Sequence, residues 1–163
     1  MNSWLVPAKK HRNKPMPQSA LIAMMIMAAA GVAIAVQAPL NAALGRAVSS
    51  PIAAATISFA VGFAVLLVCT VLLGEARAFS MLPSVPLWLF MGGALGAFYV
   101  FSALWSVPIL GVLTTTSLLI LGQVIAALII DHFGAFGLPS RDISTWRILS
   151  GVFVAIGVVL SRY

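Results

Sequence analysis

Three neutral amides lie inside or beside long apolar stretches of the sequence. Gln37 and Asn41 are four residues apart, so on a continuous helix their side chains would share one face. Gln123 follows Gly122 in the middle of another apolar stretch. A buried amide costs free energy unless it is hydrogen-bonded. We therefore predict that Gln37, Asn41 and Gln123 bind a small molecule, with a bond to a neighbouring helix as the alternative.

Two further features bear on this predicted site. Pro39 lies between Gln37 and Asn41 and removes one helical hydrogen bond, so it predicts a kink or break near Gln37 that would expose carbonyl groups. Thr115 belongs to a run of four hydroxyl residues, of which at most two can face a cavity together. We include Thr115 as a candidate for substrate binding. The alternative for these hydroxyls is a hydrogen bond to the preceding helical turn.

Asp131 and His132 are the only adjacent acid and titratable base. A carboxylate inside a membrane is the usual carrier of a coupled proton, but Asp131 stands at the edge of its apolar stretch. We favour a salt bridge or loop anchor there, with Asp131 and His132 in gating or subunit contact. Arg46 and Asp131 lie at opposite membrane faces of one chain if five helices cross the membrane, as argued below. In a dimer of two oppositely oriented chains, Arg46 of one chain would then lie on the same face as Asp131 of the other, and we predict that they interact.

The sequence lacks the residue patterns of metal sites, nucleophilic catalysis and nucleotide binding. The chain has only three acidic residues and one cysteine. Its histidines and its cysteine are not spaced like the ligands of a metal ion. No candidate nucleophile has a base at a suitable position. The chain also has no glycine-rich phosphate loop followed by lysine and serine or threonine. We predict no catalytic residue, no metal and no cofactor, and a membrane enzyme is the weakest alternative.

The elements that must position these residues follow from the composition. Hydrophobic residues make up 62% of the chain and charged residues 7%, whereas about a quarter of a soluble domain is charged. A helix of about 20 apolar residues crosses the hydrocarbon layer of a membrane. We predict an all-α membrane protein with five transmembrane helices, over about 19–37, 51–73, 87–106, 110–130 and 146–162.

Small residues recur at a spacing of four within three of these helices, and the first pair is Gly31 and Ala35. Gly92 and Gly96 have the spacing that allows two helices to approach closely, and Gly151 has the same spacing from Ala155. We predict helix packing at Gly92, Gly96 and Gly151.

The basic residues predict the orientation of the chain. Residues 1–17 form a basic tail, which favours contact with anionic lipid rather than nucleic acid. With five crossings in 18–163, seven of the nine basic residues fall on the side of the N-terminus, which predicts that this side is cytoplasmic. A cleaved secretory signal is the alternative, although the first apolar stretch exceeds the length of a signal core.

The order and spacing of many residues resemble the YdcZ-like family of the drug/metabolite transporter superfamily. The likeness runs through almost the whole chain after the tail and rests on Gly31, Gln37, Asn41, Ser50, Pro51, Ala54, Ser58, Phe59, Gly62, Gly92, Gly93, Gly96, Ala97, Phe98, Tyr99, Gly122, Gln123, Asp131, His132, Phe133, Gly134, Gly151 and Gly157. The resemblance implies a multi-pass protein of the bacterial inner membrane, with a periplasmic C-terminus in the predicted orientation. It also implies single five-helix chains that pair as antiparallel dimers, and an unidentified small-molecule substrate.

The number of helices points to the same assembly. Many transporters alternate access by rocking two inverted repeats around a central site, and five helices supply only one repeat. We therefore expect half of a ten-helix inverted-repeat transporter fold, completed by an oppositely oriented copy or homologue as a homodimer or heterodimer. The expected function is that of a subunit of a small-molecule transporter or exporter working by alternating access. The alternative is a non-transporting membrane scaffold or regulatory subunit.

Overall fold

The computed structural model describes residues 18–163, and our predictions for the tail, residues 1–17, lie outside this part of the chain. Residues 18–163 contain α-helices and short 3-10 segments but no strand, as predicted for an all-α protein. The elements are α1 (Gln18–Ala47), α2 (Pro51–Leu72), η1 (Glu75–Ser84), η2 (Leu87–Phe90), α3 (Met91–Leu110), α4 (Val112–Phe133), η3 (Ala135–Gly137) and α5 (Thr145–Leu160).

The chain divides into two compact units within α1, after Ile34. The first unit contains the N-terminal half of α1, where the side chains of Met25, Ile26 and Met27 are exposed. The second unit begins at Ala35 and contains the rest of α1 and all later elements. Every residue of the candidate site that we predicted lies in this second unit.

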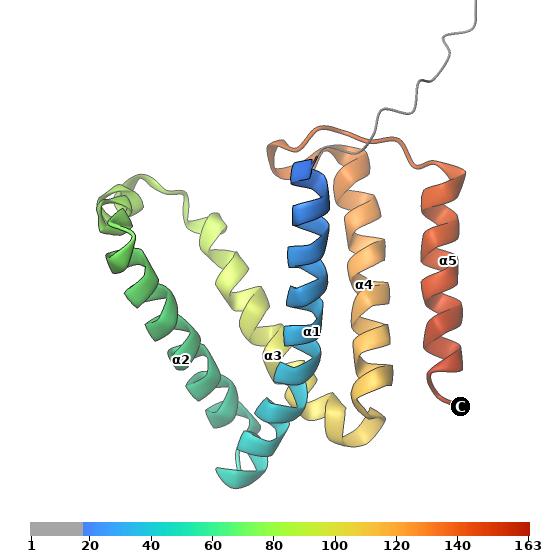
Figure 1. The fold of residues 1–163 in the computed structure, drawn as a ribbon, viewed down its shortest axis with the longest axis horizontal. Coiled ribbons are helices and arrows are strands. Elements are labelled where there is room, and N and C mark those ends of the chain that lie inside the picture. Colours follow the sequence, from blue (N-terminus) through green and yellow to red (C-terminus); the bar gives the residue numbers. More distant parts are fainter. Residues whose placement is uncertain (1–17) are drawn as a thin grey trace, which may run out of the picture. The chain divides into compact units, whose positions relative to one another are not determined.

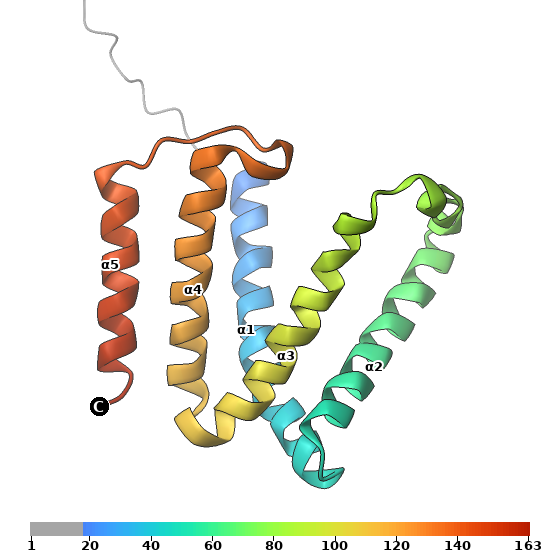
Figure 2. The same cartoon turned by 180° about the vertical axis from the view of Figure 1, so that it is seen from behind.

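The helices of the second unit run alternately up and down. In this unit α2 packs against α3, α3 against α4, and α4 against α5. The connections from α1 to α2 and from α3 to α4 lie at one end of the unit, and the segments η1, η2 and η3 lie at the other end (Figures 1 and 2). Asp131, in the last turn of α4, and Arg46, in the last turn of α1, therefore lie at opposite ends of the unit, as expected for these positions.

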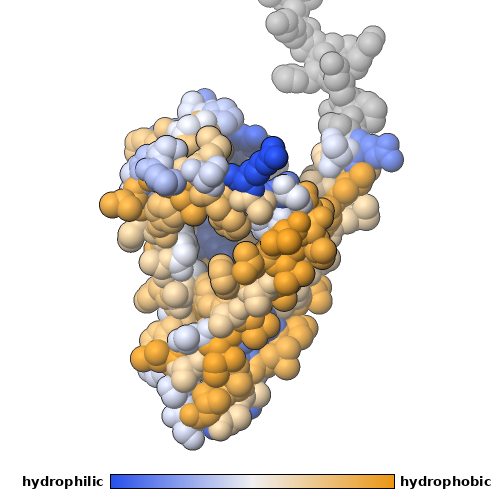
Figure 3. Space-filling view, turned by 90° about the vertical axis from the view of Figure 1, so that its left-hand side faces the viewer, coloured by the Kyte–Doolittle hydropathy of each residue, from blue (hydrophilic) through white to orange (hydrophobic). Residues whose placement is uncertain are grey.

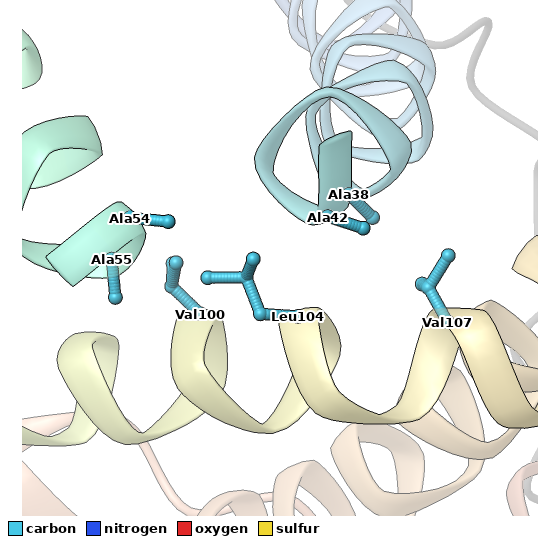
Figure 4. Close-up of a cluster of buried hydrophobic side chains, with 7 residues drawn as sticks. All are labelled: Ala38, Ala42, Ala54, Ala55, Val100, Leu104 and Val107. Atoms are coloured by element: carbon cyan, nitrogen blue, oxygen red, sulfur yellow. The ribbon is translucent and has the colours of Figure 1, made fainter. Parts of the chain in front are cut away.

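Small side chains hold the C-terminal part of α1 against α2 and α3. Ala54 is fully buried, and it belongs to one cluster with Ala38, Ala42, Ala55, Val100, Leu104 and Val107 (Figure 4). A Cβ atom added at Gly45 would lie 3.2 Å from Leu104 Cδ2 and 3.7 Å from Ala54 Cβ. Such close backbone approach is the usual way for helices to pack in membranes, where dispersion contacts replace the hydrophobic effect. This cluster is the core of the second unit.

The structure differs from our prediction at the end of the first helix. We expected this helix to end near residue 37, but α1 continues through Pro39 to Ala47. Pro39 removes one hydrogen-bond donor, and the residues around and after it, Ala38 to Gly45, gain the packing against α2 and α3 described above. We infer that this packing stabilises the last turns of the helix by more than the proline destabilises them.

Four helices of residues 18–163 are long and apolar enough to cross a membrane: Gln18–Ala47, Pro51–Leu72, Leu87–Leu110 and Val112–Phe133. The fifth, Thr145–Leu160, is apolar but has only 16 residues. Figure 3 shows hydrophobic residues over most of one face, with strongly hydrophilic residues gathered near its upper end. Together these features are typical of an all-α membrane protein.

Candidate functional site

A hollow of about 360 Å³ lies between the C-terminal part of α1, helix α2 and helix α3. Its walls are mostly apolar and carry no charged side chain: they consist of Gln37, Ser58, Phe59, Gly62, Phe63, Leu66 and Val100. Pockets of this size that are apolar with a few convergent polar groups are the usual form of a small-molecule site. We call this space the Gln37 hollow.

The polar side chains of the Gln37 hollow are those of Gln37 and Ser58. Other hydroxyls of α2 bond back to their own helix: Thr56 Oγ1 donates to the Ile52 carbonyl at 3.0 Å, and Thr70 Oγ1 donates to the Leu66 carbonyl at 2.8 Å. Within the described residues, neither Ser58 nor Gln37 makes such a side-chain bond. Both groups therefore remain free to donate to, or accept from, a bound molecule.

The structure brings Gln37 and Asn41 to different surroundings. Both lie on the continuous part of α1 and share one face, but Gln37 is exposed to the hollow whereas Asn41 is 9% exposed and lies among the buried alanines. Ser58 and Phe59 are lining residues that we did not predict as site residues. The signal for Ser58 was a hydroxyl within an apolar stretch, and both residues were part of the resemblance.

Gln123 and Thr115 do not line the Gln37 hollow. Gln123 is exposed on α4. The Thr115 hydroxyl donates to the Gly111 carbonyl at 2.7 Å, and the Thr114 hydroxyl donates to the Ser161 carbonyl at 3.0 Å, which joins α4 to the end of α5. For Gln123 and Thr115, substrate binding stays a prediction.

The three glycines predicted to pack helices have different neighbours. A Cβ atom at Gly96 would lie 3.4 Å from the ring of Phe59 on α2, and one at Gly151 would lie 3.7 Å from Val124 on α4. Gly92 has no atom within 4 Å of that position. A packing role for Gly92 stays a prediction.

Asp131 has a charged partner within its own chain. Arg147, near the start of α5, forms an ion pair with the Asp131 carboxylate, and both side chains are partly buried. The Arg141 amide donates to the Asp131 carbonyl at 2.7 Å, and Arg147 Nη1 lies 3.4 Å from the carbonyls of Arg141 and Asp142. These bonds fix the start of α5 to the end of α4 through the loop between them.

The loop itself depends on a glycine. Gly134 ends α4 in the left-handed conformation, with φ of 58°, and its amide bonds to the Asp131 carbonyl at 3.3 Å. A Cβ atom there would lie 2.8 Å from the Leu138 carbonyl oxygen. His132 is exposed, and its ring packs edge-on against Phe133 at 5.1 Å between centroids. Gating or subunit contact by Asp131, His132 and Arg46 stays a prediction.

The ion pair makes a testable contribution to stability. We expect Asp131→Asn and Arg147→Gln to lower the free energy of unfolding, with a coupling of about 1 kcal/mol in a double-mutant cycle because both side chains are partly exposed. Titration from mild detergent into dodecyl sulfate, followed by tryptophan fluorescence, measures this coupling. Asp142→Asn, a neighbouring acid outside the ion pair, serves as the control. Fully additive effects of the two substitutions would show that the pair contributes no coupling.

No group of three or more histidine, cysteine or acidic residues among residues 18–163 could hold a metal ion. Cys69 is a free, exposed cysteine on α2. The arrangement of the described residues therefore offers hydrogen bonding inside an apolar hollow as its main chemistry.

Comparison with known proteins identifies the family of the chain. Residues 22–160 match the model of the family described as "Putative inner membrane exporter, YdcZ". The chain belongs to the YdcZ family. It is also 31% identical over 129 residues to the inner membrane protein YdcZ of Escherichia coli strain K12, an alignment that covers 77% of this chain and 84% of that protein. No solved structure matches the chain.

The match confirms the resemblance found in the sequence and supports a multi-pass protein of the inner membrane. The description of the YdcZ family is that of an inner membrane exporter. Both the Gln37 hollow and the ion pair of Asp131 lie within the matched residues.

Proposed function

We propose that this YdcZ family member is one subunit of an exporter of small molecules, and that its substrate binds in the Gln37 hollow. The observation that carries the proposal is the free amide of Gln37, which shares an apolar hollow of about 360 Å³ with the hydroxyl of Ser58. An apolar wall contributes affinity, and the two polar groups fix the orientation of the bound molecule.

A complete exporter would need a second chain. Many transporters alternate access with two inverted repeats, and five helices would supply one of them. Helix α5 packs against α4 within the chain, while Phe153, Ile156 and Leu160, which share one face of it, are exposed. We propose that this face of α5 contacts an oppositely oriented copy or homologue.

Helix α5 would then cross the membrane as the fifth span. Its 16 residues extend about 24 Å, somewhat less than the hydrocarbon layer, and local thinning or flanking residues accommodate a short span at modest cost. With five spans the N-terminus is cytoplasmic and the C-terminus periplasmic, by the excess of basic residues on the N-terminal side. Reporter fusions at each terminus test this orientation, and equal signals from both sides would contradict it.

Reconstitution tests the proposed function. The purified chain, alone and with any short homologue encoded beside it, is placed in liposomes and screened for movement of small molecules. Saturable flux that depends on the protein supports the exporter. If neither flux nor ligand-induced stabilisation occurs with either sample, the chain is a membrane scaffold or regulatory subunit instead.

Substitution of Gln37 tests the proposed site. We expect Gln37→Leu to weaken substrate binding about tenfold, because one hydrogen bond contributes about 1 kcal/mol and an unpaired partner costs more. Gln123→Leu makes the same change on α4, outside the hollow, and is the matched control. If Gln123→Leu alone weakens binding, the site lies at α4 rather than in the Gln37 hollow; if both do, Gln123 joins the site.

A further inference from the structure

A second, more apolar depression lies beside the Gln37 hollow. It has a volume of about 560 Å³ and is formed by α2 and α3, with Ile52, Thr56, Phe98 and Phe101 in its walls. Ile52 is 67% exposed and Phe98 is 70% exposed. Both helices are long and apolar enough to cross a membrane, so wherever no second chain covers them these exposed side chains would meet lipid. We call this depression the lipid-facing groove.

The lipid-facing groove offers no free hydrogen-bonding side chain. The hydroxyl of Thr56 donates to the Ile52 carbonyl of its own helix at 3.0 Å, and the remaining lining side chains are apolar. A molecule in the groove would therefore make apolar contacts there. The nearest free polar side chains are Gln37 and Ser58 in the adjoining hollow.

One side chain belongs to both spaces. Phe59 lines the lipid-facing groove and also lines the Gln37 hollow. On α3 the position facing its ring is Gly96, where an added Cβ atom would lie 3.4 Å from Cζ and 3.7 Å from Cε1. An alanine at that position would place its methyl group in van der Waals contact with the ring and would reduce the room for the ring to move toward α3. The glycine therefore leaves the Phe59 ring room to move toward α3.

We propose that Phe59 is a gate between the lipid-facing groove and the Gln37 hollow, and that the substrate is an uncharged, largely apolar molecule with a hydrogen-bonding group. This inference rests on the proposed function and names its substrate class and its route of entry. The apolar part of the molecule enters through the lipid-facing groove. Its polar group then reaches Gln37 and Ser58 when the Phe59 ring moves aside.

The charge of the substrate follows from the lining of the two spaces. Neither carries an acidic or basic side chain. An ion moved from water or headgroups into such surroundings would lose its hydration without gaining a counter-charge, which is strongly unfavourable. A neutral donor or acceptor needs only one hydrogen bond to offset its burial, and Gln37 offers both an amide donor and a carbonyl acceptor.

Two dyes with one skeleton test the substrate class. N-phenylnaphthylamine is uncharged and carries one N–H group, whereas anilinonaphthalene sulfonate adds a negative charge to the same skeleton. Ethidium supplies a cation. Binding to the protein in lipid nanodiscs is measured by energy transfer from tryptophan, with empty nanodiscs as the background. We expect saturable binding of N-phenylnaphthylamine, and binding of both charged dyes that is weaker by at least about tenfold.

Stopped-flow exchange of the bound dye tests the gate. We expect Phe59→Ala to accelerate both the binding and the release of the dye, because it removes the ring. We expect Gly96→Ala to slow both rates, because its methyl group confines the ring. Gly93→Ala, which adds a methyl group where no atom lies within 4 Å, is the matched control. Gln37→Ala should instead weaken affinity through faster release with an unchanged association rate.

Each outcome bears on the proposal. Absence of saturable N-phenylnaphthylamine binding, or tighter binding of either charged dye, would overturn the substrate class even if liposomes show flux of another solute. Exchange rates that are unchanged in both Phe59→Ala and Gly96→Ala would overturn the gate. Neutral-dye binding with the expected kinetic changes but without flux would support the site and the gate, and would contradict the proposed exporter.

Discussion

Replacement of Ala54 by leucine is expected to destabilise the chain by about 3 kcal/mol, through overpacking of a fully filled position. Ala54 is 0% exposed and lies where α1, α2 and α3 meet. The three added carbon atoms would enter a filled junction, in which an added Cβ atom at Gly45 would already be in contact with Ala54 Cβ at 3.7 Å. Titration into dodecyl sulfate measures the free energy of unfolding.

The control for this prediction lies on the same helix. Ala64 is exposed on α2, so Ala64→Leu adds the same atoms where they meet no tightly packed neighbour. We expect Ala64→Leu to change stability by less than about 0.5 kcal/mol. If both variants unfold at the same detergent composition, the three-helix junction is not a packed core.

Substitution of Gly134 by alanine is the second change with a large expected effect. The backbone of Gly134 has φ of 58°, a conformation that costs a residue with a side chain about 1 to 2 kcal/mol. The added methyl group would also lie 2.8 Å from the Leu138 carbonyl oxygen, so the loop must shift. We expect a total loss of about 3 kcal/mol, because conformational strain and close contact both act at this position.

A second left-handed glycine separates these two causes. Gly74 has φ of 73°, but an added Cβ atom there would have no neighbour within 4 Å. Gly74→Ala should therefore show only the conformational cost, about 1 kcal/mol. The difference between the two variants, measured in the same titration, is the cost of disturbing the loop that joins Asp131 to Arg147. Equal losses would mean that this loop adjusts freely.

The all-α fold and four of the five expected membrane-crossing helices could be predicted from the sequence, because continuous apolar stretches of about 20 residues are typical of helices that cross a membrane. The fifth helix, α5, has only 16 residues. The end of the first helix could not be predicted from the sequence. The local effect of Pro39 favours a break, and only the packing of Ala42 and Gly45 against other helices reverses it. That packing depends on residues far away in the sequence, such as Leu104 on α3.

The candidate site was predicted in part. Gln37 was selected because an amide in an apolar stretch needs a partner, and it does line a hollow. Gln123 was selected by the same argument but lies outside that hollow, since the sequence does not show which face of α4 meets which helix. The partner of Asp131 was also hidden, because Arg147 follows 16 residues later across an irregular loop.

Flux through reconstituted liposomes tests the central claim, that this chain moves a small molecule through the Gln37 hollow. Release of a solute that binds the protein but does not leak from empty liposomes is compared among wild type, Gln37→Leu, Gln123→Leu and empty liposomes, with any neighbouring homologue included. We predict saturable flux for wild type that falls about tenfold in Gln37→Leu at low substrate concentration. Flux that is identical in wild type and empty liposomes, or unchanged by Gln37→Leu, would contradict the claim.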